Sequence, residues 1–436
     1  MTRSLSETAK ALGIEYFLIC YVDLAGTPRA KLVPAAAIDE MARVGAAFAG
    51  FATWLDMTPA DPDLFARPDP SSLIQLPWKP DVGWLAADPW MNDAPVAHAP
   101  RNLLKRLIAD AATDGYQMKT GVECEYFLIT PAGDVISDGS DVQVKPCYDQ
   151  QALMRRFDVI AEICNAMQAL GWGPYQNDHE DANGQFEMNW TYDDALVTAD
   201  RHVFFKYMVK TIAERHGMRA TFMPKPFSHL TGSGCHTHVS IWSTGSPPEN
   251  LFLDPAGPLG LSALAYQFLG GIMYSAEALC AITNPTVNSY KRINAPVTVS
   301  GATWSPNAIS YSGNNRTHMV RIPEAGRFEL RLPDGSANPY LLQAGILACG
   351  IDGIRNGRDP GERLDINMYT ERYKANGVRG LPLNLLDATR NFEKSDVFAP
   401  AFGEEFMKAY TRHKHGEWQT FSCHLTDWER HHTLDC

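Results

Sequence analysis

The stretch Arg327-Phe328-Glu329-Leu330-Arg331 has the pattern of a β-strand with one apolar face and one charged face. Phe328 and Leu330 would point to one side and the charged residues to the other, because successive side chains of a strand alternate. Taken alone, this pattern is typical of a sheet edge whose charged face meets water. Other predicted strands carry the same kind of polar face, which favours a shared functional surface.

Two further stretches place carboxylates on predicted strands. Residues 121–128 read as one strand in which Glu123 and Glu125 share a face, and acidic residues are poor strand formers. Glu180 and Glu187 flank an Asn-Gly turn, which is the strongest short hairpin signal. A hairpin of this length can bring both carboxylates over one point. An exposed edge and a polar surface turn stay open as alternatives.

A glycine-rich turn at 232–234 leads into a strand on which His236, His238 and Ser240 share a face. A lone histidine is usually structural, but two at i and i+2 beside such a turn are candidate ligands. We therefore predict that six side chains with oxygen or nitrogen donors lie close together: Glu123, Glu125, Glu180, Glu187, Glu329 and His236.

Five carboxylates cannot share a cleft while all are ionised. At about 4 Å each like-charge pair costs roughly 4 kcal/mol, even at an effective dielectric of about 20. The groups either take up protons or hold cations, and two divalent ions with three protein ligands each would use all six donors. Carboxylates with one imidazole suit Mg²⁺ or Mn²⁺.

An arginine cluster would supply the opposite charge: Arg292, Arg316, Arg321, Arg327 and Arg331. Guanidinium groups bind carboxylate and phosphate oxygens through planar forks. Metal ions beside such a cluster are the equipment of phosphoryl transfer, in which positioning and charge neutralisation supply most of the catalysis. The turn at 232–234 lacks the Lys-Ser/Thr of a Walker A motif, which argues against a P-loop enzyme.

Composition bounds the class of protein. The 436 residues are 45% hydrophobic and 20% charged, as in a soluble globular enzyme. The net charge of −12 argues against nucleic acid as the main partner. Nine scattered cysteines without a CxxC pair, and an N-terminus without an apolar h-region, predict reduced thiols in the cytoplasm. The apolar residues 269–282 are interrupted by Glu277 and predict a buried helix and no contact with a membrane.

Along the chain we expect a small α/β unit over residues 1–100 and a larger part over 101–436. The first unit should hold a helix at 6–12, strands at 16–22 and around 29–31, a loop at 56–70 and a Pro/Asp-rich boundary at 77–100. Helices are expected at 101–113, 150–170, 200–216, 260–282, 339–356, 384–394 and 404–417. Lys206 and Lys210 are expected on a solvated face, and residues 294–315 as a long ordered loop.

Seven ordered blocks resemble the glutamine synthetase family over nearly the whole chain. They are Gly121-x-Glu123-x-Glu125, His179-Glu180 with Gly184-Gln185-x-Glu187, Lys225-Pro226, Gly232-Ser233-Gly234-x-His236-x-His238-x-Ser240, Asn288-Ser289-Tyr290-Lys291-Arg292, Asn315-Arg316 with Arg321-Ile322-Pro323, and Arg327-x-Glu329-x-Arg331 with Asn338-Pro339-Tyr340. The resemblance implies an α+β fold with an N-terminal β-grasp-like domain and a catalytic domain built on a curved antiparallel sheet with flanking helices. It also implies a dodecamer of two stacked hexamers, with active sites between neighbouring subunits.

The resemblance implies roles by motif position. Glu125, Glu180 and Glu187 would hold one metal, and Glu123, His236 and Glu329 the other. The nucleotide contacts would be His238, Ser240, Arg321 and Arg327; the glutamate contacts would be Gly232, Arg292 and Arg331. Arg316 is placed to meet the transferred phosphate. In the family's chemistry ATP phosphorylates the γ-carboxylate of glutamate, and an amine then displaces phosphate.

Two departures bear on which amine is used. The family's N-terminal turn, Phe-Asp-Gly-Ser-Ser, has an aspartate that binds ammonium and helps take its proton, whereas Phe48-Ala49-Gly50-Phe51-Ala52 has none. The family's flap carries Tyr-Glu-Ala-Pro, whereas this chain reads Ile293-Asn294-Ala295-Pro296 and has no acid until Glu324. Tyr148 and Glu180 match the remaining pocket positions.

The amine pocket has thus lost charge and gained carbon, which favours methylamine over ammonium. The flap resembles that of the glutamate–methylamine ligases within the family. A methyl group in an apolar pocket is worth roughly 1–3 kcal/mol, about 10–200-fold, so ammonia stays a poor substrate. Asp56 and Asp178 are the candidates for the missing base.

Three alternatives stay open. One is a glutamine synthetase that uses ammonium, and another is a ligase for a longer amine such as a polyamine or ethanolamine. A non-catalytic scaffold or nitrogen sensor is disfavoured, because all six ligand positions are filled. Tyr369 lies near a tyrosine that some bacterial relatives adenylylate, but the residues after it diverge, and a packed tyrosine is the preferred interpretation.

Overall fold

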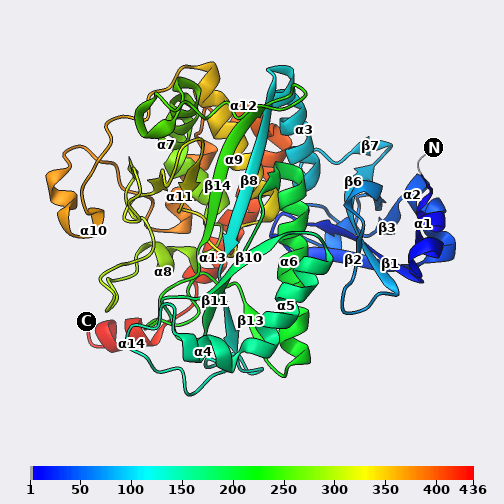
Figure 1. Ribbon diagram of the computed structural model, residues 1–436, viewed down its shortest axis with the longest axis horizontal. Coiled ribbons are helices and arrows are strands. Elements are labelled where there is room, and N and C mark those ends of the chain that lie inside the picture. Colours follow the sequence, from blue (N-terminus) through cyan, green and yellow to red (C-terminus); the bar gives the residue numbers. More distant parts are fainter. Residues whose placement is uncertain (1–2) are drawn as a thin grey trace.

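Three β-sheets and the helices around them organise the chain in the computed structural model, which describes residues 3–436 (Figure 1). The N-terminal sheet lies at one end of the long axis, and the long strands β8 (Tyr116–Cys124) and β14 (Cys235–Ser243) cross the middle. The predicted α+β class, with an N-terminal β unit and a larger C-terminal part, is confirmed.

The N-terminal sheet has seven strands in the order β2-β1-β6-β4-β3, with β5 and β7 also paired to β6. The strands are β1 (Tyr16–Val22), β2 (Pro28–Pro34), β3 (Ala46–Phe48), β4 (Leu64–Pro68), β5 (Ile74–Gln75), β6 (Val82–Met91) and β7 (Ala94–Pro95). Helices α1 (Leu5–Leu12) and α2 (Ile38–Val44) belong to the same part of the chain. Strand β1 pairs in parallel with β6, so β6 is a central strand.

One prediction for this part is wrong. Residues 56–70 were expected as loop, yet they include β4, in which Leu64 and Ala66 are fully buried and Phe65 is 39% exposed. The Pro/Asp-rich band at 77–100, expected to mark a boundary, contains the ten-residue strand β6. In both segments the prolines and aspartates in and around the strand hid it from sequence analysis. The division near residue 100 stays a prediction.

The larger part holds two sheets. The six-stranded sheet has the order β12-β8-β14-β17-β16-β15, and the four-stranded sheet has the order β10-β11-β9-β13. The strands not yet given are β9 (Tyr126–Ile129), β10 (Pro174–His179), β11 (Gln185–Trp190), β12 (Asp193–Asp194), β13 (Arg219–Thr221), β15 (Tyr311–Ser312), β16 (Val320–Arg321) and β17 (Phe328–Leu330). All pairs are antiparallel except β15 with β16.

The charged strand of the sequence is not an edge. Strand β17 lies between β14 and β16, and Glu329 at its centre has no exposed surface. The predicted single strand 121–128 is two strands, because the chain leaves the six-stranded sheet after Cys124 and enters the four-stranded sheet at Tyr126. Glu125 therefore stands at the junction of the two sheets.

Helices cover the sheets. They are α3 (Pro100–Thr113), α4 (Gln150–Arg155), α5 (Phe157–Ala169), α6 (Ala195–Arg215), α7 (Ala263–Thr283), α8 (Ser289–Ile293), α9 (Pro339–Arg355), α10 (Met368–Glu371), α11 (Leu385–Glu393), α12 (Phe398–Phe402), α13 (Glu404–Ser422) and α14 (Asp427–Thr433). Helices α7 and α9 cross closely, since a Cβ on Gly271 would lie 1.9 Å from the carbonyl oxygen of Cys349. Helix α7 is largely buried, and within residues 3–436 no helix combines the length and apolarity needed to span a membrane.

Two helix predictions need correction. The helix expected at 150–170 is broken at Arg156, whose guanidinium donates to the hydroxyl and carbonyl oxygens of Ser137. Lys206 is not on a solvated face, because its Nζ donates to the carbonyl of Ala337 at 3.1 Å and lies 5.8 Å from the ring of Phe222.

Candidate active site

A cavity of about 170 Å³ opens where the six-stranded sheet, the β10–β11 hairpin and the loop after α8 meet. All six predicted metal ligands line it: Glu123, Glu125, Glu180, Glu187, His236 and Glu329. Tyr148, Arg316, Arg321 and Arg331 line it as well. The structure therefore brings together side chains that the sequence spreads over more than 200 positions.

The hairpin supplies the first group of carboxylates. Glu125, Glu180 and Glu187 each place a carboxylate oxygen within 4.8 Å of the other two. Glu125 is held at the sheet junction, since its Oε2 accepts hydrogen bonds from the backbone N–H of Gly234 at 2.7 Å and from Nε2 of Gln185 at 2.9 Å. The predicted Asn-Gly hairpin is confirmed.

These carboxylates repel one another. Burial, together with the charges of Glu125 and Asp178, raises the pKa of Glu180 to about 8. Burial and the charges of Glu123 and Glu180 raise the pKa of Glu187 well above its ordinary value. The group cannot be fully ionised at neutral pH without added positive charge, as the sequence argument required.

The second group lies on β8, β14 and β17. Nδ1 of His236 is 3.6 Å from a carboxylate oxygen of Glu123 and 3.6 Å from one of Glu329. Burial would raise the pKa of Glu123, but hydrogen bonds from His236 and His238 lower it well below its usual range. Burial opposes ionisation of Glu329 too, yet the charge of Arg331 and the two histidines lower its pKa to about 2.

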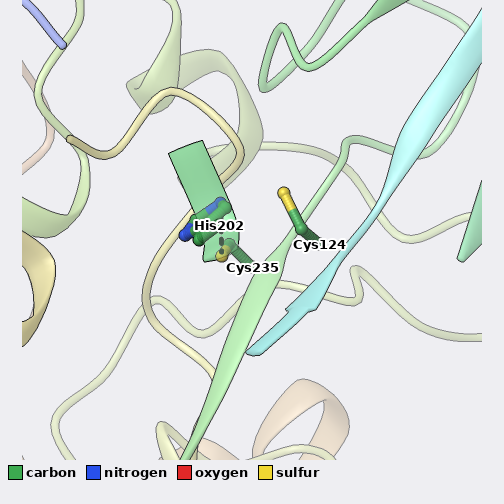
Figure 2. Close-up of side chains that lie close together, drawn as sticks. All are labelled: Cys124, His202 and Cys235. Atoms are coloured by element: carbon green, nitrogen blue, oxygen red, sulfur yellow. Dashed lines mark hydrogen bonds between the residues drawn. The ribbon is translucent and has the colours of Figure 1, made fainter. Parts of the chain in front are cut away.

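Because side chains alternate along a strand, one face of β8 and β14 lines the cavity and the other face is buried. Cys124 and Cys235, which alternate with the cavity-lining residues, point to the other side of the strands toward His202 of α6 (Figure 2). Cys235 Sγ lies 3.9 Å from His202 Nε2, and all three side chains are fully buried. Burial lowers the pKa of His202, which keeps its imidazole neutral. All nine cysteines are free.

Both cavity-facing groups fit hard divalent cations. Carboxylate oxygens with a single imidazole are the donors that Mg²⁺ and Mn²⁺ prefer. The raised pKa values of Glu180 and Glu187 show that these side chains gain from a neighbouring positive charge.

A second cavity, of about 380 Å³, adjoins the first and shares Glu123, Tyr175 and Asn189 with it. Three of the four predicted nucleotide contacts line it: His238, Ser240 and Arg327. The fourth, Arg321, lines the first cavity and donates to Glu329 at 2.8 Å. The two cavities are thus neighbours at the six-stranded sheet.

Comparison with known proteins decides the family. The family model described as the glutamine synthetase catalytic domain matches residues 97–433. The chain belongs to the glutamine synthetase family.

Members of the glutamine synthetase family match along the whole chain. A protein named glutamine synthetase from Rhizobium meliloti (strain 1021) is 62% identical over 435 residues, with 100% of both chains covered. A protein named glutamate–methylamine ligase from Methyloversatilis universalis is 40% identical over 425 residues, with 95% of both covered. A solved structure described as "GmaS/ADP complex-Conformation 1" is 63% identical, has a TM-score of 0.96 and is covered fully in both directions.

The three predicted glutamate contacts of the glutamine synthetase family differ in whether they reach the surface of the cavity. Arg331 lines the cavity, whereas Arg292 is 1% exposed, is absent from the lining and donates to the carbonyl of Leu332 at 3.0 Å. A Cβ on Gly232 would lie 2.5 Å from the carbonyl of Pro224, so only glycine fits there. Arg292 and Gly232 thus lie behind the wall of the cavity.

Arg316 differs from the other arginines of the glutamine synthetase motifs. Its side chain is exposed and makes no hydrogen bond or ion pair with another part of residues 3–436. Its backbone carbonyl accepts a hydrogen bond from the hydroxyl of Tyr369 at 3.3 Å. A guanidinium at the cavity that is free of internal partners suits an incoming anion.

Aromatic side chains line the cavity as well. Tyr148, Tyr175 and Trp304 line it, and so does Asp178. Burial and the charge of Glu123 raise the pKa of Asp178. The other candidate base, Asp56, does not line the cavity and pairs with Arg412 at 3.0 Å.

Several lining residues were not predicted from the sequence: Tyr175, Asn189, Thr231 and Trp304. Asn189 lies two residues after Glu187 on the same strand face, a spacing that would have found it. Thr231 precedes the glycine-rich turn directly. No local pattern marks Trp304, which sits within the long loop at 294–315.

Proposed function

We propose that the chain joins methylamine to the γ-carboxylate of L-glutamate in a reaction driven by ATP, and that it forms γ-N-methylglutamine, ADP and phosphate. The observation that carries this proposal is the full-length likeness to the structure described as a GmaS/ADP complex, at 63% identity and a TM-score of 0.96. GmaS is a glutamate–methylamine ligase. The relative named glutamate–methylamine ligase adds support at 40% identity.

The reaction has two steps. A γ-carboxylate oxygen attacks the terminal phosphorus of ATP, ADP leaves, and γ-glutamyl phosphate forms. The nitrogen of methylamine then attacks the activated carbonyl carbon, the C–O bond to phosphate breaks, and a proton leaves the nitrogen. Asp178 is the best-placed acceptor for that proton, since it lines the cavity with a raised pKa.

Different residues of the two cavities bind the nucleotide, the glutamate and the transferred phosphate in this proposal. His238, Ser240 and Arg327 hold the nucleotide in the larger cavity. Arg321, which lines the smaller cavity, also contacts the nucleotide, and Arg331 contacts the glutamate. The free guanidinium of Arg316 contacts the phosphate in transfer. Arg292 and Gly232 act from behind, as supports for the glutamate site.

Two divalent cations complete the site. Glu125, Glu180 and Glu187 hold one, and Glu123, His236 and Glu329 hold the other. Mg²⁺ or Mn²⁺ held by these residues would neutralise the phosphate oxygens of ATP and would keep the carboxylates ionised.

The amine is selected, in this proposal, by the aromatic side chains that line the cavity. Tyr148 and Trp304 provide apolar surface for a methyl group. A methyl group in such a pocket is worth roughly 10–200-fold. We therefore expect kcat/KM for methylamine to exceed that for ammonium by about that factor.

The test measures product formation from glutamate, ATP and Mg²⁺ with methylamine, ammonium, ethanolamine and a polyamine in turn. Preference for methylamine in kcat/KM supports the proposal, and preference for ammonium overturns it. The second candidate is glutamine synthetase activity, which the names of the 62% identical Rhizobium relatives favour. Failure of ATP turnover with every amine would indicate a scaffold.

The chain also assembles, in this proposal, as a cytoplasmic dodecamer of two stacked hexamers. Phe51 and Trp54, in the region that the family turns toward a neighbouring subunit, are 46% and 55% exposed. Light scattering should give the mass of twelve copies of the 48.3 kDa chain. A monomer that is fully active would contradict the assembly.

A further inference from the structure

One carboxylate oxygen fastens the loop at 294–310 to the β10–β11 hairpin. Oδ2 of Asp181, next to Glu180, accepts hydrogen bonds from Nε1 of Trp304 at 2.5 Å, from Oγ of Ser300 at 2.8 Å and from Oγ1 of Thr298 at 3.2 Å. The Asp181 residue is only 7% exposed. Hydrogen bonds to a buried charge are the strong ones in proteins.

The loop has little else to hold its tip. Val297 and Val299 are 51% and 65% exposed, so apolar packing does not anchor this segment. A tight turn forms within it, in which the N–H of Thr298 donates to the carbonyl of Ala302 at 2.8 Å. Trp304 has a φ of 54°, a conformation that bulky residues adopt only when their surroundings enforce it.

Asp181 is itself firmly placed. The hydroxyl of Thr231 donates to its backbone carbonyl at 3.0 Å and to its Oδ2 at 3.3 Å. Its backbone N–H donates to Oε2 of Glu180 at 3.2 Å. The carboxylate therefore ties three segments together: the hairpin that carries Glu180, the turn before Gly232, and the loop.

We propose that Asp181 is a positioning residue for the amine. Asp181 holds the indole of Trp304 in the wall of the cavity. The place where the amine binds is thereby kept apolar and closed, so that methylamine reaches the γ-glutamyl phosphate in preference to ammonia and water. This inference rests on the proposed function and names the residue that shapes its acceptor pocket. Asp181 does not line the cavity and acts through Trp304.

The loop lacks an acid of its own between residues 293 and 323. The acid comes instead from the hairpin, and it meets only hydroxyl and indole donors from the loop. Release of the loop would expose the reacting centre to water, because Trp304 is part of its wall. Two effects should follow together: loss of amine selectivity, and hydrolysis of the activated glutamate.

The experiment uses the full chain and the variants Asp181→Ala, Asp181→Asn, Trp304→Phe and Val299→Ala. Three quantities are measured: kcat/KM for methylamine, kcat/KM for ammonium, and ATP hydrolysis with glutamate in the absence of amine. Trp304→Phe keeps an aromatic ring but removes the N–H donor. Val299→Ala changes an exposed residue of the same loop.

Asp181→Ala should lower the methylamine-to-ammonium ratio of kcat/KM by about 10- to 100-fold, the range for hydrogen bonds to a charged group. It should also raise ATP hydrolysis without amine. Trp304→Phe should move both quantities the same way by less, because two donors remain. Asp181→Asn should fall between wild type and Asp181→Ala, because its amide oxygen still accepts. Val299→Ala should match wild type.

Unchanged selectivity and unchanged amine-free ATP hydrolysis in a folded Asp181→Ala protein would overturn the inference. If Asp181→Ala does not fold, the variants Trp304→Phe and Ser300→Ala test the inference in the same assays. Wild-type selectivity and wild-type amine-free ATP hydrolysis in both variants would also overturn it. If the unaltered protein prefers ammonium, the proposed function fails. The amine-free hydrolysis of the variants then still shows whether Asp181 closes the site.

Discussion

Burial and the neighbouring carboxylates of Glu125, Asp178 and Glu123 raise the pKa of Glu180 to about 8, so we expect this group to carry a proton at neutral pH in the cation-free protein. A divalent cation that binds to Glu180 must displace this proton. Binding of Mg²⁺ at pH 7 should therefore release protons, and the release should fade as the pH rises above 8, where the group is already ionised. The folded pKa lies above the ordinary value, so the cation-free site is most stable at low pH and loses stability as the pH rises toward 8.

Titration calorimetry in two buffers of different ionisation enthalpy measures this proton release. We expect the apparent binding enthalpy of Mg²⁺ to differ between the buffers at pH 7 and to converge at pH 9. Equal enthalpies at pH 7 would mean that Glu180 is already ionised without the cation. The substitution Glu180→Gln serves as the control and should reduce the difference between the buffers, because it removes one of two titrating groups and leaves Glu187, whose pKa is also raised.

The β10–β11 hairpin carries two of the predicted metal ligands, and Asp141 fixes its turn through hydrogen bonds. Asp141 accepts hydrogen bonds from Nε2 of His179 at 2.7 Å, Nδ2 of Asn183 at 2.8 Å and the N–H of Gly184 at 2.6 Å. Its residue is 3% exposed. Removal of this acceptor leaves buried donors unpaired, which costs about 1–3 kcal/mol for each.

Asp141→Ala should thus lower the free energy of unfolding by about 2–4 kcal/mol. It should also weaken Mg²⁺ binding by about 10-fold or more, because the turn that Asp141 holds sets the positions of Glu180 and Glu187. Denaturant titration and calorimetry measure the two effects. Asp134→Ala, at an exposed acid that bonds only to Thr130, is the matched control and should change neither. Normal Mg²⁺ affinity in Asp141→Ala would show that the turn does not set the ligand spacing.

Elements with a strong local pattern could be predicted from the sequence, and tertiary contacts could not. The alternation of polar and apolar residues placed Glu123, His236 and Glu329 on one face, and the Asn-Gly turn placed Glu180 opposite Glu187. The change of sheet at Glu125 leaves no local trace, because no glycine or proline separates the two strands. The contact of Asp181 with Trp304 joins residues 123 positions apart, and nothing in either segment announces it.

One buried arginine contacts both the N-terminal sheet and the rest of the molecule. Arg101, at the start of α3, contacts Asp69 at 2.9 Å and Asp88 at 2.6 Å in the N-terminal part, and Asp200 of α6 at 2.9 Å. It is 2% exposed. Three carboxylates around one guanidinium leave a large uncompensated charge if the guanidinium is removed.

Arg101→Met should lower the free energy of unfolding by about 3–5 kcal/mol, the usual cost of breaking a buried ion pair. Arg355→Met is the matched control, since Arg355 also binds two aspartates but its side chain is 45% exposed. That change should cost about 1 kcal/mol or less. Denaturant unfolding at one protein concentration compares the two variants. Equal losses would show that Arg101 is not the main tie between the parts.

Two bound cations hold the five glutamates of the site together in the proposed enzyme. Anomalous diffraction from crystals grown with ADP and Mn²⁺ locates such ions directly. We expect two manganese peaks, one among Glu125, Glu180 and Glu187 and one among Glu123, His236 and Glu329. A map with no peak within bonding distance of these six side chains, or with the side chains dispersed, would contradict the account.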